Sequence, residues 1–202
     1  MKNRLWISGL FIVLACASSC GTSNQQSQTT QTQAPDSRPP DEMMLFDFSN
    51  STAAGGWRVE DDVVMGGVSR GRFFINDAGN GVFSGNVSLE NNGGFSSVQH
   101  DFDPIDVSAY STAMIRLKGD GKRYQFRVES DRRERHAYVY TFQTTGEWQT
   151  VEIPLREMTP QFRGRRLNLP NYPGQTMAQA RFLIANGVPE SFRLEIDEIR
   201  LK

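Results

Sequence analysis

Four acidic residues and a histidine have side chains that could support acid–base chemistry. Glu60, Asp61 and Asp62 are consecutive, Asp197 lies near the carboxyl end, and His136 follows a run of charged residues. Two carboxyl groups facing each other across a cleft could act as acid and base on a glycosidic bond. Acidic residues beside turns more often contact water or cap backbone amides. Because no H-E-x-x-H motif occurs either, we expect no catalytic residue and no enzymatic activity.

The chain has few side chains that could bind a metal or a cofactor. His100 and His136 are the only histidines, and the only cysteines, Cys16 and Cys20, lie before residue 21. The remaining chain therefore has no thiol for a zinc site, a redox pair or a nucleophile. We expect neither a metal nor a cofactor.

Two glycine-rich segments could cradle an anion with successive backbone amides. They are Gly66-Gly67 and Asn91-Asn92-Gly93-Gly94. Neither is followed by a helical pattern or a Lys-Ser/Thr pair, which excludes a nucleotide-binding loop. The segments are predicted to be tight turns, and their polar tips, Asn91 and Asn92, are candidates for lining a surface site.

Three arginines, Arg123, Arg127 and Arg163, are candidates for contacting an anionic partner. Residues 116–166 hold twelve Lys/Arg against seven acidic residues, whereas residues 43–115 hold three Arg against nine acidic residues. Arg123 and Arg127 alternate with apolar residues, which predicts that they share one face of a strand. Arginine forks on that face could bind an acidic or carboxylate-bearing partner. The alternative is a solvated face whose arginines form ion pairs with neighbouring acids.

Four aromatic residues could stack on a sugar ring: Trp57, Phe95, Tyr124 and Trp148. Tyr124 and Trp148 lie in alternating strands, and both are predicted to belong to the core. Trp57 follows Gly55-Gly56 at a strand entrance, where exposure and burial are equally consistent with the sequence.

The first 20 residues are typical of an export signal. A basic start precedes an apolar run, residues 5–15, that is too short to span a bilayer. Small residues precede both Cys16 and Cys20, and both sites resemble the lipobox of bacterial lipoprotein precursors. Cys16 has the better aliphatic residue three positions earlier, whereas cleavage before Cys20 leaves no spare thiol; the alternative is an ordinary secretory signal. Residues 21–42, rich in Gln, Thr, Ser and Pro, are predicted to be a disordered tether.

Residues 43–202 are predicted to form one all-β domain. Residues 123–128, 148–153 and 192–199 alternate between apolar and polar side chains, and turn signals such as residues 91–94 separate such runs. About ten short strands without a long amphipathic helix favour an antiparallel β-sandwich or jelly roll.

Five stretches of this domain resemble, in order, the motifs of the complex I intermediate-associated protein 30 family: residues 57–71, 88–98, 119–127, 146–151 and 193–197. The resemblance implies a galactose-binding-like jelly roll, in agreement with the strand pattern. For the mitochondrial members it also implies a non-enzymatic role in assembling respiratory complex I through protein contacts. Fold transfers between such relatives better than partner does.

The expected function is binding. A net charge of −1 gives no general footprint for nucleic acid. We expect a lipid-anchored module of the bacterial cell envelope, facing the periplasm or exterior, whose partner is a protein in or near the membrane. Its role there would be that of a complex-assembly factor. The alternative is a carbohydrate or cell-wall binding module.

Overall fold

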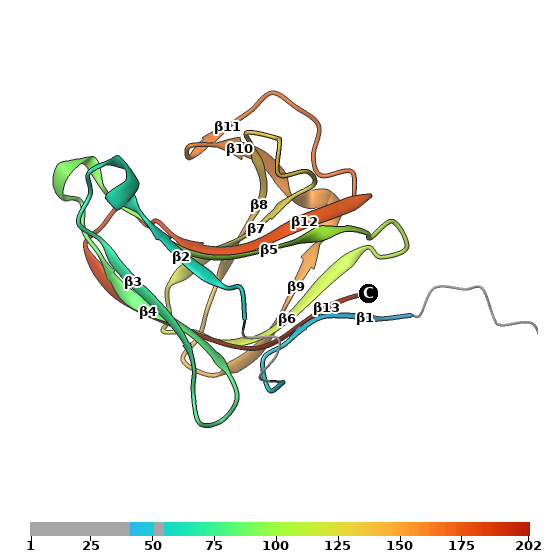
Figure 1. The fold of residues 1–202 in the computed structure, drawn as a ribbon, viewed down its shortest axis with the longest axis horizontal. Coiled ribbons are helices and arrows are strands. Elements are labelled where there is room, and N and C mark those ends of the chain that lie inside the picture. Colours follow the sequence, from blue (N-terminus) through green and yellow to red (C-terminus); the bar gives the residue numbers. More distant parts are fainter. Residues whose placement is uncertain (1–40, 51–54) are drawn as a thin grey trace, which may run out of the picture. The chain divides into compact units, whose positions relative to one another are not determined.

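The computed structural model describes residues 41–50 and 55–202, which form two antiparallel sheets packed face to face (Figure 1). The first sheet has six strands. Five of them run in the order β3 (Arg70–Ile75), β4 (Gly81–Val87), β13 (Glu190–Leu201), β6 (Thr112–Lys118) and β9 (Trp148–Pro154), while β1 (Met43–Asp47) pairs with the second half of β13.

The second sheet has seven strands and carries the site discussed below. Its order is β11 (Arg165–Arg166), β10 (Thr159–Phe162), β8 (Ala137–Gln143), β7 (Arg123–Glu129), β12 (Thr176–Ile184), β5 (Ser96–Asp106) and β2 (Arg58–Asp61). The predicted all-β sandwich is confirmed.

The core lies between the two sheets, because alternation directs every second side chain of each strand inward. In β7, Tyr124, Phe126 and Val128 are buried, whereas Arg123, Gln125 and the residues that follow at the same spacing face outward. The prediction that Tyr124 belongs to the core is confirmed.

Trp148 departs from the prediction that it is a core residue. The inward-facing residues of β9 are Val151 and Ile153, so Trp148 has the opposite parity and lies half-buried on the outer face of the first sheet. The Arg116 guanidinium lies 5.2 Å from the centre of its ring. Trp148 was misassigned because the apolar residues of this strand change parity between positions 148 and 151.

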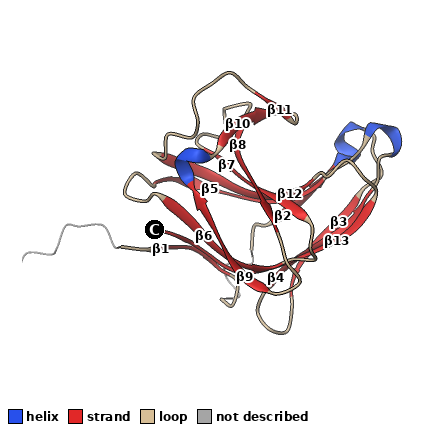
Figure 2. Cartoon of the chain, turned by 180° about the vertical axis from the view of Figure 1, so that it is seen from behind, coloured by secondary structure: helices blue, strands red, loops and turns tan. Residues whose placement is uncertain are grey.

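Three short 3₁₀ helices interrupt the strands: η1 (Asp62–Met65), η2 (Glu90–Asn92) and η3 (Leu155–Glu157). Figure 2 shows η1 and η2 together at one side of the molecule. None of the helices in the part of the chain that the structure describes is long and apolar enough to cross a membrane. Cys16, Cys20 and the predicted tether up to residue 40 lie outside the described residues.

Candidate functional site

A groove of about 600 Å³ lies on the outer face of the seven-stranded sheet. Its floor is formed by side chains of β2, β12, β7 and β8. The loops that contain η1 and η2 form one wall, and the turn between β10 and β11 forms the other (Figure 1). Three segments that are far apart in the sequence therefore enclose one surface.

Two arginines lie side by side in the floor. Arg127 of β7 is the register partner of Arg181 of β12, so their side chains leave neighbouring strands on the same face. Arg181 contacts Glu60 of β2, with 3.7 Å between the guanidinium and the carboxylate, and donates a hydrogen bond to the Gln179 amide oxygen at 3.2 Å. Arg181 is therefore held in place by its neighbours.

Arg127 is less satisfied than Arg181. Its Nε is buried and has no hydrogen-bond partner among the described residues. Burial, followed by the charge of Arg181, lowers the pKa of Arg127 to about 10. The guanidinium still carries its charge at neutral pH, but the folded protein does not neutralise that charge well. A negatively charged ligand would neutralise it.

Glu129, two residues along β7, is the nearest acidic residue on the same strand face. Burial raises the pKa of Glu129 above its usual range, although Arg181 and Arg127 oppose the rise. The protonated form of this carboxyl group is therefore favoured more than it is in water.

The first wall is built around the buried carboxylate of Asp62. Its oxygens accept hydrogen bonds from the Ser69 amide at 3.0 Å, the Ser69 hydroxyl at 2.5 Å, the Gly94 amide at 2.6 Å and the Phe95 amide at 3.2 Å. Burial raises the pKa of Asp62, but these hydrogen bonds outweigh it and hold the pKa below its usual value. One carboxylate thereby joins two loops of distant sequence.

Glycines let both loops approach that carboxylate. A side chain at Gly67 or Gly93 would clash with Asp62. The turns predicted at these glycines are present, and close approach to Asp62 gives a physical reason for both. Neighbouring Asp61 is used similarly, because its carboxylate accepts hydrogen bonds from the Gly71 amide at 2.9 Å and the Ser96 hydroxyl at 2.5 Å.

The acidic residues considered for acid–base chemistry do not converge. Asp61 and Asp62 hold loops together, whereas Asp197 forms an ion pair at 2.8 Å with Arg116 on the other sheet. Glu60 lies in the groove. Across residues 41–50 and 55–202, no group of three or more His, Cys, Asp or Glu side chains could hold a metal ion.

The second wall is a two-residue hairpin. Phe162 of β10 pairs with Arg165 of β11, and the connecting Arg163 and Gly164 have φ angles of 49° and 75°. Positive φ at both positions is the type I′ pattern, which usually takes Asn-Gly. The guanidinium groups of Arg163 and Arg135 lie 5.4 and 5.5 Å from the centre of the Phe162 ring. Three side chains thus form a cationic and aromatic rim.

The family that the motifs suggested is confirmed by a direct comparison. Residues 46–196 match the model of the complex I intermediate-associated protein 30 (CIA30) family. The chain belongs to this family. A comparison with curated proteins finds no match.

Solved structures similar to this CIA30 chain are β-sandwich modules. A family 11 carbohydrate-binding module from Clostridium thermocellum, in complex with a β-1,3-1,4-mixed-linked tetrasaccharide, has a TM-score of 0.59 at 18% identity, covering 79% of this chain and 94% of its own. The same family's module from the cellulase Lic26A-Cel5E of Clostridium thermocellum has a TM-score of 0.59 at 18% identity, with coverages of 81% and 95%. The agarase AgWH50C has a TM-score of 0.53 at 12% identity, covering 80% of this chain but 24% of its own. At these identities the likeness establishes the fold alone.

The structure brings together three of the six candidate binding residues of the CIA30 domain. Asn92, Arg127 and Arg163 line the groove. Asn91 precedes Asn92 with the same left-handed backbone, and its side chain is exposed. Arg123 is exposed on the same strand face as Arg127 but does not line the groove.

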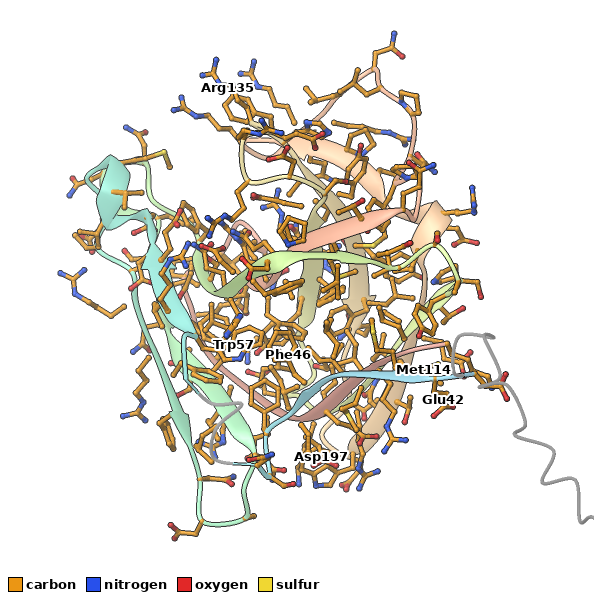
Figure 3. The ribbon with its side chains drawn as sticks, turned by 45° about the vertical axis from the view of Figure 1, so that its right-hand side comes forward. Glu42, Phe46, Trp57, Met114, Arg135 and Asp197 are labelled. Carbon is orange, nitrogen blue, oxygen red and sulfur yellow. The ribbon has the colours of Figure 1, made fainter. Side chains whose placement is uncertain are left out.

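Trp57 lies elsewhere. Its ring is half-buried in an aromatic cluster, 5.0 Å from Phe46 and 5.5 Å from His100 (Figure 3). Figure 3 shows Trp57 beside Phe46, away from Arg135 at the outer edge. The sequence left burial and exposure open for Trp57, and the structure favours burial.

Some residues of the groove could not be predicted from the sequence. Glu129 and Arg135 have no signal in the sequence beyond their place in the basic region of residues 116–166, and Arg181 lies outside that region. The arginine pair depends on the register of β7 against β12, two strands about 50 residues apart in the sequence, and strand alternation alone does not reveal that register. Other arginines of residues 116–166 form ion pairs with neighbouring acids, which is the alternative that the sequence left open, as with Arg133 and Asp131 at 2.6 Å.

Proposed function

We propose that this chain is a non-catalytic binding module that holds a carbohydrate chain in the groove of its seven-stranded sheet. The observation that carries the proposal is the groove itself, which is open, about 600 Å³ in volume and lined by both polar and aromatic side chains. A similar fold carries a tetrasaccharide in the family 11 module, and this supports the choice of ligand class.

The lining suits sugar rings in two ways. Gln125, Gln161 and Glu129 offer amide and carboxyl groups that can pair with hydroxyls, and Arg127 offers a fork of donors. Phe162 lies in the wall and presents an aromatic ring. Convergent polar groups beside apolar faces are typical of small-molecule and sugar sites.

A second candidate is the protein-binding role expected from the sequence, in which a lipid-anchored copy in the cell envelope helps to assemble a membrane complex. Val63, Val64 and Met65 of η1 favour it, because they are 47%, 70% and 57% exposed beside the groove. Exposed apolar residues that cluster in this way often mark protein interfaces. The family description points in the same direction.

Affinity electrophoresis of the full chain in gels containing soluble polysaccharides tests the first candidate. We expect retardation in at least one gel and its loss in Phe162→Ala. Phe74→Ala is the matched control, because Phe74 is an exposed phenylalanine of the other sheet that also has an arginine, Arg72, 5.6 Å from its ring centre. The absence of retardation in every gel would reject carbohydrate binding.

The second candidate has its own variant. Val63→Asp adds charge to the exposed apolar surface of η1 at a residue that does not line the groove. If the role is protein binding, this change should abolish capture of a membrane partner by the full chain, while any retardation by polysaccharide persists. Loss of retardation without loss of capture would favour the carbohydrate.

A further inference from the structure

The groove is more basic than the chain that contains it. Four arginines line it, at positions 127, 135, 163 and 181, against two acidic residues, Glu60 and Glu129. The whole chain has a net charge of −1, so the excess of positive charge is local. Charges of one sign in a walled groove concentrate counter-ions and oppositely charged ligands there.

The two arginines of the floor repel each other, because they carry like charges on neighbouring strands. Arg127 and Arg181 are direct register partners, and like charges opposite each other destabilise a pair of strands. Glu60 offsets the charge of Arg181 at 3.7 Å, but no ion pair to Arg127 exists among the described residues. The Arg127 Nε is buried without a hydrogen-bond partner in the same part of the chain. A guanidinium that is half-buried, charged and without an ion pair is suited to receive an anion.

The rim of the groove has a second group of positively charged side chains. Arg163 adopts a positive φ of 49°, a left-handed backbone conformation that is unfavourable for a non-glycine residue. The strained residue directs a guanidinium onto Phe162, where Arg135 joins it. The wall therefore places positive charge next to an aromatic ring, away from the arginine pair of the floor.

We propose that the groove selects an acidic saccharide, in which a carboxylate of a uronic acid unit binds the Arg127 fork and a neighbouring unit lies against Phe162, Arg135 and Arg163. The inference rests on the proposed function and narrows its ligand class. Carboxylates fit because a planar guanidinium binds them through two parallel hydrogen bonds. A saccharide fits better than an acidic peptide because the same wall combines charge with a flat ring.

Glu129 is the acidic residue that follows Arg127 on the same strand face, and burial raises the pKa of its carboxyl group above its usual range. The polar groove residues Gln125 and Gln161 carry no charge and can bind either sugar hydroxyls or a carboxylate.

Calorimetric titration of the full chain tests the inference with three acidic tetrasaccharides, of galacturonate, mannuronate and glucuronate. The matched control for each is its methyl ester, which keeps the sugar but removes the charge. Hexaglutamate serves as the acidic peptide. We expect at least one acidic tetrasaccharide to bind about tenfold or more tightly than its ester, and more tightly than hexaglutamate.

Variants then locate the site. Arg127→Gln should weaken that binding about tenfold and remove the preference for the acid, whereas Arg127→Lys, which keeps the charge without the fork, should weaken it less. The melting temperature of Arg127→Gln should be unchanged or higher, because the variant removes an unpaired buried charge. Arg156→Gln, an exposed arginine outside the groove, should bind like the unaltered chain.

The outcomes separate the two levels of the proposal. Equal binding of acid and ester overturns the acidic preference and leaves carbohydrate binding intact. Tighter binding of hexaglutamate, or acid binding that Arg127→Gln leaves unchanged, also overturns the inference. If neither acids nor esters bind, and polysaccharide gels do not retard the chain, carbohydrate binding itself fails.

Discussion

At the scale of single residues, the structure shows which aromatic side chains pack in the core of the sandwich and which lie on its outer faces. Phe126 is fully buried between the sheets, whereas Trp148 lies on an outer face under the Arg116 guanidinium. Both occur in strands with mostly alternating patterns, and their roles differ because of parity alone. Size and hydrophobicity do not decide burial unless the register of the strand is known.

A pair of truncations measures this difference. Phe126→Ala should lower the free energy of unfolding by about 3 to 5 kcal/mol, because a large cavity would form between the sheets. Trp148→Ala should cost less than about 2 kcal/mol, since part of the indole already contacts water and its stacking with Arg116 contributes about 0.5 to 1 kcal/mol. Urea unfolding of both variants checks the prediction. Equal costs would show that Trp148 is as important to the core as Phe126.

At the scale of elements, Asp62 connects the loop of η1 to the loop of η2. The conspicuous acidic and glycine-rich motifs of the sequence are thus largely devices for shaping the first wall of the groove. The glycines clear space for the carboxylate, and the backbone amides of Gly94 and Phe95 satisfy it. Residues that resemble catalytic acids or an anion loop in the sequence bind each other in the structure.

Asp62→Asn should destabilise the protein by about 2 to 4 kcal/mol at neutral pH, because an amide NH₂ would face donors that now point at a carboxylate oxygen. The folded-state pKa of Asp62 lies below its unfolded value of about 3.9, so its stabilisation is present above that pH and is lost as the pH falls through the folded pKa. The stability of the variant should therefore fall less steeply in acid. Urea unfolding at neutral pH and in acid checks both parts; equal acid sensitivity would contradict the prediction.

The hairpin of the second wall makes a different prediction. Arg163→Asn places Asn-Gly in a type I′ turn, so the variant should gain about 0.5 to 1 kcal/mol of stability. It also removes one cation from the rim and should weaken binding of an acidic ligand. Thermal unfolding and calorimetry on the same variant check both effects. A loss of stability would show that stacking on Phe162 outweighs the backbone strain.

At the scale of the whole molecule, alternation, turn chemistry and motif resemblance together predicted the sandwich and the family. They predicted about ten strands, whereas the described residues contain thirteen. β12 escaped because Met177, Ala178 and Ala180 make it a nearly continuous buried run rather than an alternating one. Asn92, Arg127 and Arg163, which line the groove, each have a local signal in the sequence. Arg181 has no such signal, because its place beside Arg127 depends on the pairing of β12 with β7.

The anchoring of the molecule depends on residues outside the described structure and stays a prediction from the sequence. Replacement of Cys16 and Cys20 together with Ser should release the protein into the soluble fraction or leave an unprocessed precursor, because the thiol that would carry the lipid is gone. Each single replacement serves as a control and identifies the acylated position. Membrane fractionation with metabolic lipid labelling gives the readout. Unchanged labelling of the double variant would show that neither cysteine carries the lipid. The prediction that a lipid anchor holds this domain at a membrane would then be wrong.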